Sequence, residues 1–166
     1  LADMGDMPED PNVIFQAWLT TSLFEWEDDG FPFWSHFNHA RSFWDFQHMP
    51  NLHFLHYQDL KDDLSGQMKR LAGFLDIEID EAAWPELVDA ATFDSMKNKA
   101  SQMAPESTVG LWKDDSQFFN KGTSGQWQGV LSDESMALYG RVRTQKMSPD
   151  LADWLEKGSL ICGYPR

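Results

Sequence analysis

The sequence predicts an α/β segment that is mostly helical and contains few strands. Several stretches carry apolar residues at the spacing of one helix face, whereas only residues 52–57 resemble a short buried parallel strand. With 166 residues, 42% of them hydrophobic, the chain is large enough to bury one core. We therefore expect residues 1–166 to belong to a single domain, with residues 1–11 as a flexible lead-in.

Helices are expected where apolar residues return every three or four positions, or where a serine can cap a first helical turn. The predicted helices cover residues 12–27, 35–46, 64–75, 80–92, 132–143 and 148–158. Several of them start at a residue that accepts hydrogen bonds from a first helical turn: Asn12, Ser35, Ser132 and Ser148. Gly158 follows the last helix and is expected to end it.

The one predicted strand, residues 52–57, follows Pro50 and Asn51 and ends on Tyr57. In open α/β sheets, ligands gather at the carboxyl ends of the parallel strands. Tyr57 therefore stands where a nucleotide base could be contacted.

The charge balance limits the partners of the chain. With 27 acidic and 13 basic residues, the net charge is −14 and no basic stripe interrupts it, so neither nucleic acid nor an anionic membrane is expected as a partner. The lone Cys162 excludes an intrachain disulfide and fits a reducing, cytoplasmic compartment. Nothing near the N-terminus has the pattern of a signal peptide, and no apolar run is long enough to cross a membrane.

Two pairs of histidines have a spacing that can share a metal ion: His36 with His39, and His53 with His56. The second pair falls in the predicted strand, where residues three apart point to opposite faces. No cysteine or carboxylate stands at a fitting offset. Packed side chains are the preferred interpretation, and no metal site is predicted.

The most informative stretch is FNKGTSGQW at residues 119–127. Gly122 and Gly125 can adopt positive φ and leave backbone N–H groups open to one anion, while Lys121 adds a positive charge. Aromatic residues at both ends can hold this stretch in a core: Phe118, Phe119 and Trp127. The stretch predicts an anion-binding loop, and an ordinary surface turn is the alternative.

This stretch resembles the RKGxxGDW signature of the sulfotransferases that use 3′-phosphoadenosine 5′-phosphosulfate as donor. A second stretch, HMPNLHFLHYQDLKDDL at residues 48–64, is similar to the HPNILFLFYEDMKEDL segment of that family. The resemblance runs from about residue 12 to residue 163 and corresponds to the C-terminal portion of the family's P-loop-type parallel-sheet fold. It implies that the N-terminal portion, which carries the phosphosulfate loop and the catalytic lysine, is missing.

The resemblance also implies which residues bind. The positions that match the adenosine and 3′-phosphate side of the family's site are Tyr57, Phe93, Met96, Asn120, Lys121 and Gly122. His39 matches the histidine of a WYxHVxxWW segment that borders the acceptor pocket. No catalytic residue is identified in this chain.

By this resemblance, the expected activity is transfer of a sulfuryl group to a hydroxyl or amine of a small-molecule acceptor, with adenosine 3′,5′-bisphosphate as the other product. The chain alone is expected to be incomplete and inactive, and to need a missing N-terminal portion or a companion chain. A second hypothesis stays open, a non-catalytic acidic binding domain derived from the same fold. It rests on neutral residues where the family has charged ones: Asn120, Gln126 and Gln128.

Overall fold

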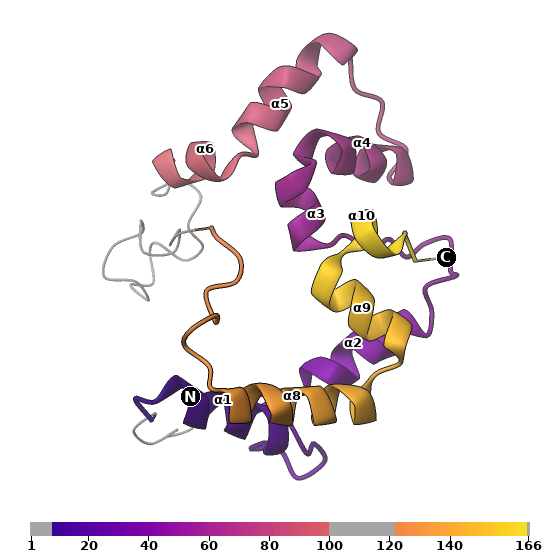
Figure 1. Cartoon of the computed structure of the whole chain (residues 1–166). Coiled ribbons are helices and arrows are strands. Elements are labelled where there is room, and N and C mark those ends of the chain that lie inside the picture. The colour runs from indigo at the N-terminus through magenta and orange to yellow at the C-terminus, as the bar shows by residue number, and fades with distance from the viewer. Residues whose placement is uncertain (1–7, 100–121, 166) are drawn as a thin grey trace. The chain divides into compact units, whose positions relative to one another are not determined.

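The computed structural model describes residues 8–99 and 122–165 (Figure 1). Within these ranges all regular secondary structure is helical, and the chain divides into two compact units, Leu1–Phe54 with Gly125–Arg166 and Leu55–Ser124. The first unit contains α1 (Pro11–Thr20), α2 (His36–Trp44), α8 (Asp133–Lys146), α9 (Pro149–Lys157) and α10 (Ser159–Cys162). The second unit contains α3 (Tyr57–Asp62), α4 (Leu64–Phe74), the 3₁₀ turn η1 (Glu81–Ala83), α5 (Trp84–Ala90) and α6 (Phe93–Asn98).

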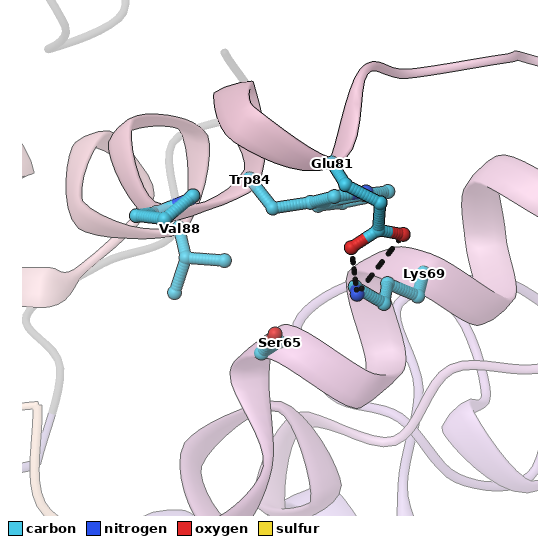
Figure 2. A pocket seen from close by; sticks show the side chains of 6 residues that line it. Ser65, Lys69, Glu81, Trp84 and Val88 are labelled. Carbon is cyan, nitrogen blue, oxygen red and sulfur yellow. Dashed lines mark hydrogen bonds and ion pairs between the residues drawn. The ribbon is translucent and has the colours of Figure 1, made fainter.

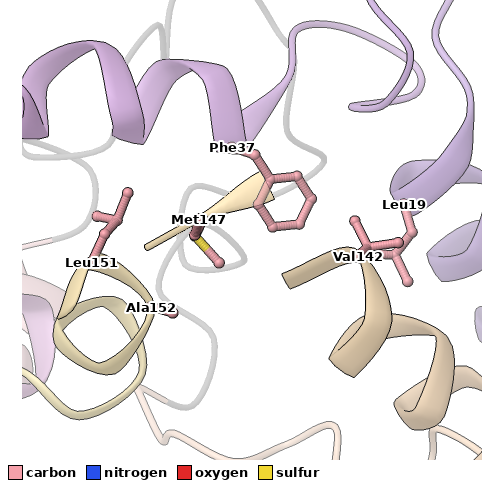
Figure 3. Packing of buried hydrophobic residues seen from close by; sticks show 6 residues of the cluster. All are labelled: Leu19, Phe37, Val142, Met147, Leu151 and Ala152. Carbon is pink, nitrogen blue, oxygen red and sulfur yellow. The ribbon is translucent and has the colours of Figure 1, made fainter. Parts of the chain in front are cut away.

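The first unit is built on a core of six buried side chains. They come from α1, α2, α8, α9 and the turn between the last two: Leu19, Phe37, Val142, Met147, Leu151 and Ala152 (Figure 3). Phe37 and Leu151 are each only 1% exposed. The Trp18 ring packs against Phe37 with 5.4 Å between ring centroids, and Trp44 packs against Trp154 at 5.5 Å. Segments that precede and follow the second unit in sequence therefore share one core.

Three predicted helix starts are confirmed. Ser35, Ser132 and Ser148 each accept a hydrogen bond from the backbone N–H three residues later, over 3.0, 3.2 and 3.3 Å. Gly158, with φ of +81°, ends α9 as predicted. Short-range hydrogen bonds and a single glycine set these boundaries, which is why the local sequence predicted them.

The predicted helix at residues 12–27 is wrong at both ends. Asp10 rather than Asn12 caps α1, and the helix stops at Thr20. The hydroxyls of Thr20 and Thr21 donate back to carbonyl groups of the preceding turn, at 2.8 and 2.9 Å, a local bonding pattern that weakens continued helix.

Asn12 lies inside α1 rather than at its cap, and its side chain has another role. The Asn12 side chain accepts hydrogen bonds from the Ser132 N–H at 2.7 Å and from the Ser135 hydroxyl at 2.9 Å. It thus connects α1 to the start of α8. Leu23 and Trp26, which lie beyond the end of α1, are 52% and 74% exposed.

Arg143 of α8 holds α9 through two carboxylates. Its guanidinium lies 3.0 Å from Asp153 and 2.7 Å from Glu156. Glu156 also accepts a hydrogen bond from the Tyr139 hydroxyl at 2.8 Å. Burial, together with this bond, raises the pKa of Tyr139 to about 12. The tyrosine is therefore a neutral hydrogen-bond donor in this contact at ordinary pH.

Lys146, near the end of α8, pairs with Asp28 and Asp29. Asp29 is fully buried, and its Oδ2 lies 2.9 Å from Lys146 Nζ. The hydrogen bond from Lys146 holds the pKa of Asp28 below its usual value. Burial opposes the charge on Lys146, but its bonds to the two carboxylates outweigh burial and raise its pKa. The segment before α2 is thereby fixed to α8.

The second unit packs α4 against α3 and α5. The predicted helices at residues 64–75 and 80–92 both form, the latter as η1 followed by α5, with Asp80 as the cap of η1. Trp84 at the start of α5 is 8% exposed, and Lys69 Nζ of α4 lies 5.2 Å from its ring centroid. The amphipathic patterns thus predicted these two helices.

No strand forms at residues 52–57 in the part of the chain that the structure describes, contrary to the prediction. The backbone is extended at His56, with φ of −101° and ψ of 134°. A strand also needs a hydrogen-bonding neighbour, and none of the described segments supplies one. Tyr57 is instead the first residue of α3.

The Leu151→Ala substitution is expected to lower the free energy of unfolding by about 2–5 kcal/mol, because it leaves a cavity in the core. Urea denaturation followed by tryptophan fluorescence measures this loss. The control, Leu160→Ala, makes the same change at a residue that is 46% exposed and should cost less than about 1 kcal/mol. Equal losses at the two positions would contradict the core assigned to the first unit.

Candidate functional site

Tyr57 stands at the start of α3. The side chain of His56 caps this helix, because its Nδ1 accepts a hydrogen bond from the Gln58 N–H at 3.1 Å. Tyr57 is 60% exposed, whereas Asp59 in the same helix is 1% exposed. The helix therefore buries one face and leaves the Tyr57 ring accessible to a ligand.

A chain of hydrogen bonds connects α3 to residues 122–124. Lys61 Nζ donates to the Ser124 hydroxyl at 3.1 Å, and that hydroxyl donates to Gln58 Oε1 at 2.8 Å. Gln58 Nε2 in turn donates to Asp62 Oδ1 at 2.8 Å. Ser124 is thus held on the exposed face of α3.

Gly122 lies against the ring of Phe93, the first residue of α6. Its φ is +62°, and a β-carbon at this position would lie 2.9 Å from the ring. Glycine suits both this backbone conformation and this spacing. Thr92 caps α6 by accepting from the Ser95 N–H at 3.2 Å, so the ring is presented at the start of the helix.

Residues 122–124 therefore contact α6 through Gly122 and α3 through Ser124. These contacts link Gly122, Phe93 and the helix that carries Tyr57 within the second unit. Met96, half-buried, lies three residues after Phe93 on α6.

The rest of the predicted anion-binding stretch is only partly described. Asn120 and Lys121 lie outside the described residues, as do the two phenylalanines before them. Gly125 has the predicted positive φ, +74°. Trp127, which was expected to anchor the stretch in a core, is 49% exposed, so that expectation is wrong.

His39 belongs to α2 in the first unit. Its exposed ring meets Phe43 edge-on, with 5.1 Å between ring centroids. Burial and, secondarily, the charge of His39 lower the pKa of His36 one turn earlier, and Asp29 opposes them. His39 is therefore accessible to a ligand from solvent.

A shallow pocket of about 330 Å³ lies elsewhere on the second unit (Figure 2). It is lined by Ser65, Lys69, Glu81, Trp84, Pro85 and Val88. Lys69 Nζ pairs with Glu81 at 3.1 Å, with side chains 44% and 81% exposed, so solvent screens the pair. None of the residues that the sequence predicts for a site lines this pocket.

Among the described residues, no three side chains of the histidine, cysteine, aspartate and glutamate types come together as a metal-binding group. No helix within residues 8–99 and 122–165 has the length and apolar character to span a membrane.

Sequence reasoning missed Lys61, Gln58 and Ser124 as a connected group. The predicted strand ends on Tyr57, and a strand gives no reason to pair this residue with Lys61. On a helix, residues four apart share a face, and this spacing was the available signal.

The chain matches a protein family over most of its length. The model of the sulfotransferase domain family covers residues 3–149. A glycolipid sulfotransferase of Mycobacterium bovis is 38% identical over 116 residues, which are 69% of this chain and 35% of that protein. The luciferin sulfotransferase of Photinus pyralis is 29% identical over 107 residues, 61% of this chain and 29% of that protein. The chain thus spans about a third of the length of these curated relatives.

The fold has a counterpart among solved structures. Mouse sulfotransferase SULT7A1, solved in complex with PAP, matches with a TM-score of 0.71 at 21% identity, over 90% of this chain and 52% of that one. This match confirms the predicted fold class, a mostly helical part of a sulfotransferase fold. From the family match and the 38% identical relative, we conclude that this chain belongs to the sulfotransferase family.

Proposed function

We propose that the protein containing this chain transfers a sulfuryl group from 3′-phosphoadenosine 5′-phosphosulfate to a hydroxyl or amine of a small-molecule acceptor. This chain would supply the adenosine and 3′-phosphate side of the site. The observation that carries the proposal is the contact of residues 122–124 with both α3 and α6, on the helices that bear Tyr57 and Phe93. In the reaction, the sulfur–oxygen bond to the 5′-phosphate breaks, a bond to the acceptor forms, and the acceptor loses a proton.

The described residues fit the chemistry of an adenosine bisphosphate. Tyr57 and Phe93 offer aromatic rings to the base. Gly122 carries no side chain over its backbone, and Lys61, held by the Ser124 hydroxyl, offers N–H donors to a phosphate. When bound, the donor supplies the sulfuryl group, while these residues hold its nucleotide part.

Further residues of the site are proposed from the family resemblance. Met96 would add a second apolar wall beside Phe93. Asn120 and Lys121 would hold the 3′-phosphate together with Gly122. His39, which is exposed on α2, is proposed for the acceptor side.

We infer that the groups that stabilise the departing phosphate belong to another portion of the protein or to a companion chain. This inference is supported by length, because the chain spans only about a third of the length of its relatives. A cytoplasmic location is proposed from Cys162, a lone, exposed thiol that suits a reducing compartment.

A second candidate function is a non-catalytic acidic binding domain on the same fold. The net charge of −14 favours it, as does the loss of charged residues from the RKGxxGDW signature at Asn120 and Gln126. The two candidates differ in one property, because only the sulfotransferase requires an adenosine nucleotide to bind.

The Tyr57→Ala substitution is expected to weaken the binding of adenosine 3′,5′-bisphosphate to the complete protein by roughly 1–3 kcal/mol, the scale of losing an aromatic contact with a base. Tyr57→Phe keeps the ring and should bind nearly as tightly as the parent protein. Isothermal titration calorimetry measures both affinities. An unchanged affinity in Tyr57→Ala would leave Tyr57 as a surface residue, and a parent protein that binds no nucleotide would favour the second candidate.

The Gly122→Ala substitution is expected to lower the free energy of unfolding by about 1–2 kcal/mol, because alanine is strained at positive φ and its β-carbon meets the Phe93 ring. Gly73→Ala on α4 is the control, since no atom lies within 4 Å of the added carbon. Helix propensity should make this control neutral or more stable, by up to about 1 kcal/mol. If urea denaturation finds the two variants equally stable, Gly122 does not rest on α6.

The isolated 166-residue chain is expected to transfer no sulfuryl group to a model phenol, because the groups that stabilise the departing phosphate are assigned to another portion of the protein. Product formation from the donor, followed by chromatography, measures this activity. The complete protein is the positive control. Turnover by the chain alone, well above background, would mean that the chain contains its own complete catalytic site.

A further inference from the structure

Lys61 and Tyr57 share one face of α3. They lie four residues apart, about one helical turn, and Lys61 Nζ is 6.0 Å from the centroid of the Tyr57 ring. A positive charge therefore stands beside an exposed aromatic ring. Each can contact a different part of one ligand, the ring a base and the ammonium an anionic group.

In the hydrogen bonds around Lys61, the donor and the acceptor of each bond are fixed. A hydroxyl has one proton to donate, and Ser124 gives it to Gln58 Oε1, so Ser124 Oγ is an acceptor towards Lys61. Gln58 is oriented in turn, because its Nε2 donates to Asp62. This arrangement positions the Lys61 ammonium group beside residues 122–124. Its bond to Ser124 uses only one of the three N–H donors of the ammonium group.

The charge of Lys61 is not cancelled by a carboxylate in the described structure. Lys69 pairs with one carboxylate, and Arg143 and Lys146 each pair with two. Lys61, by contrast, forms no ion pair within residues 8–99 and 122–165, and donates to a neutral hydroxyl. Its charge is therefore available to an anion that approaches residues 122–124.

The acidic residues near Lys61 are occupied by other contacts. Asp59 is buried, Asp62 accepts from Gln58, and Asp63 accepts from the Gly66 N–H at 2.9 Å. The net charge of the chain acts through a screened field, whereas an ammonium acts on a phosphate within a few ångströms. A local cation can therefore bind an anion on this acidic protein.

We propose that Lys61, positioned by Ser124, is a specificity-determining residue that recognises the 3′-phosphate of the bound nucleotide. This inference rests on the proposed function and deepens it. Lys61 supplies a positive charge beside Ser124. In the sequence, Asn120 replaces the arginine of the RKGxxGDW signature. The Tyr57 ring on the same helix face then contacts the base of the same nucleotide.

The test compares two nucleotides, adenosine 3′,5′-bisphosphate and adenosine 5′-monophosphate, by titration calorimetry on the complete protein. Lys61→Met should weaken binding of the bisphosphate by roughly tenfold, the scale of a partly exposed charge-assisted hydrogen bond, and binding of the monophosphate by less than about twofold. The loss should shrink as salt is added. Lys61→Arg, which keeps the charge, should bind the bisphosphate within about threefold of the parent protein.

Two further variants separate recognition from packing. Lys69→Met removes a lysine of the same unit that is paired with Glu81, and it should leave both affinities unchanged. Ser124→Ala should weaken the bisphosphate less than Lys61→Met does, and the double variant should be no weaker than Lys61→Met alone. Circular dichroism establishes that each variant is folded.

Several results would overturn the inference. One is that Lys61→Met loses equal affinity for the bisphosphate and the monophosphate. Another is that Lys61→Arg binds the bisphosphate as weakly as Lys61→Met does. The third is that Lys61→Met binds the bisphosphate as tightly as the parent protein. In each case the parent protein still binds the bisphosphate, so the proposed function survives. A parent protein that binds neither nucleotide overturns the proposed function, and the inference with it.

Discussion

The burial of the Asp29 carboxylate beside Lys146 is the constraint on which the first unit depends. A buried charge is costly unless it is paired, and Lys146 Nζ lies 2.9 Å away. Gly30, the next residue, is buried with φ of +94°, and any side chain there would strike the backbone of Trp34 and Ser35. Ser35 caps α2, so the turn at Asp29 and Gly30 fixes the start of this helix and thereby the position of Phe37 in the core. One ion pair and one glycine thus set the position of a whole helix.

In the second unit, a glycine and a set of hydrogen bonds hold the candidate site in place. Gly122 meets an aromatic ring at a distance that excludes a side chain, and Ser124 is held by hydrogen bonds to α3. The site therefore depends on contacts between residues far apart in sequence rather than on one motif. Lys61 and Tyr57 themselves are presented together because they stand four residues apart on α3, although residues 52–57 form no strand in the described structure.

Local chemistry accounts for the parts of the structure that the sequence predicted. Serine caps and a terminal glycine act within one helical turn, so α2, α8 and α9 were found close to their true starts. Two short motifs were enough to identify the family and its fold. The strand at residues 52–57 failed because strand pairing is non-local. The contact between Lys61 and Ser124 could not be predicted from the local sequence for a related reason, because it joins positions 63 apart.

The order of the two units along the chain has a consequence for biosynthesis. Leu19 and Phe37 precede the second unit, whereas Val142 and Leu151, which complete the same core, follow it. The second unit is one continuous stretch, so it can fold while later residues are still being added. Until α8 and α9 leave the ribosome, Leu19 and Phe37 lack the Val142 and Leu151 side chains that complete their core. That contact therefore waits for as long as residues 55–124 take to be translated.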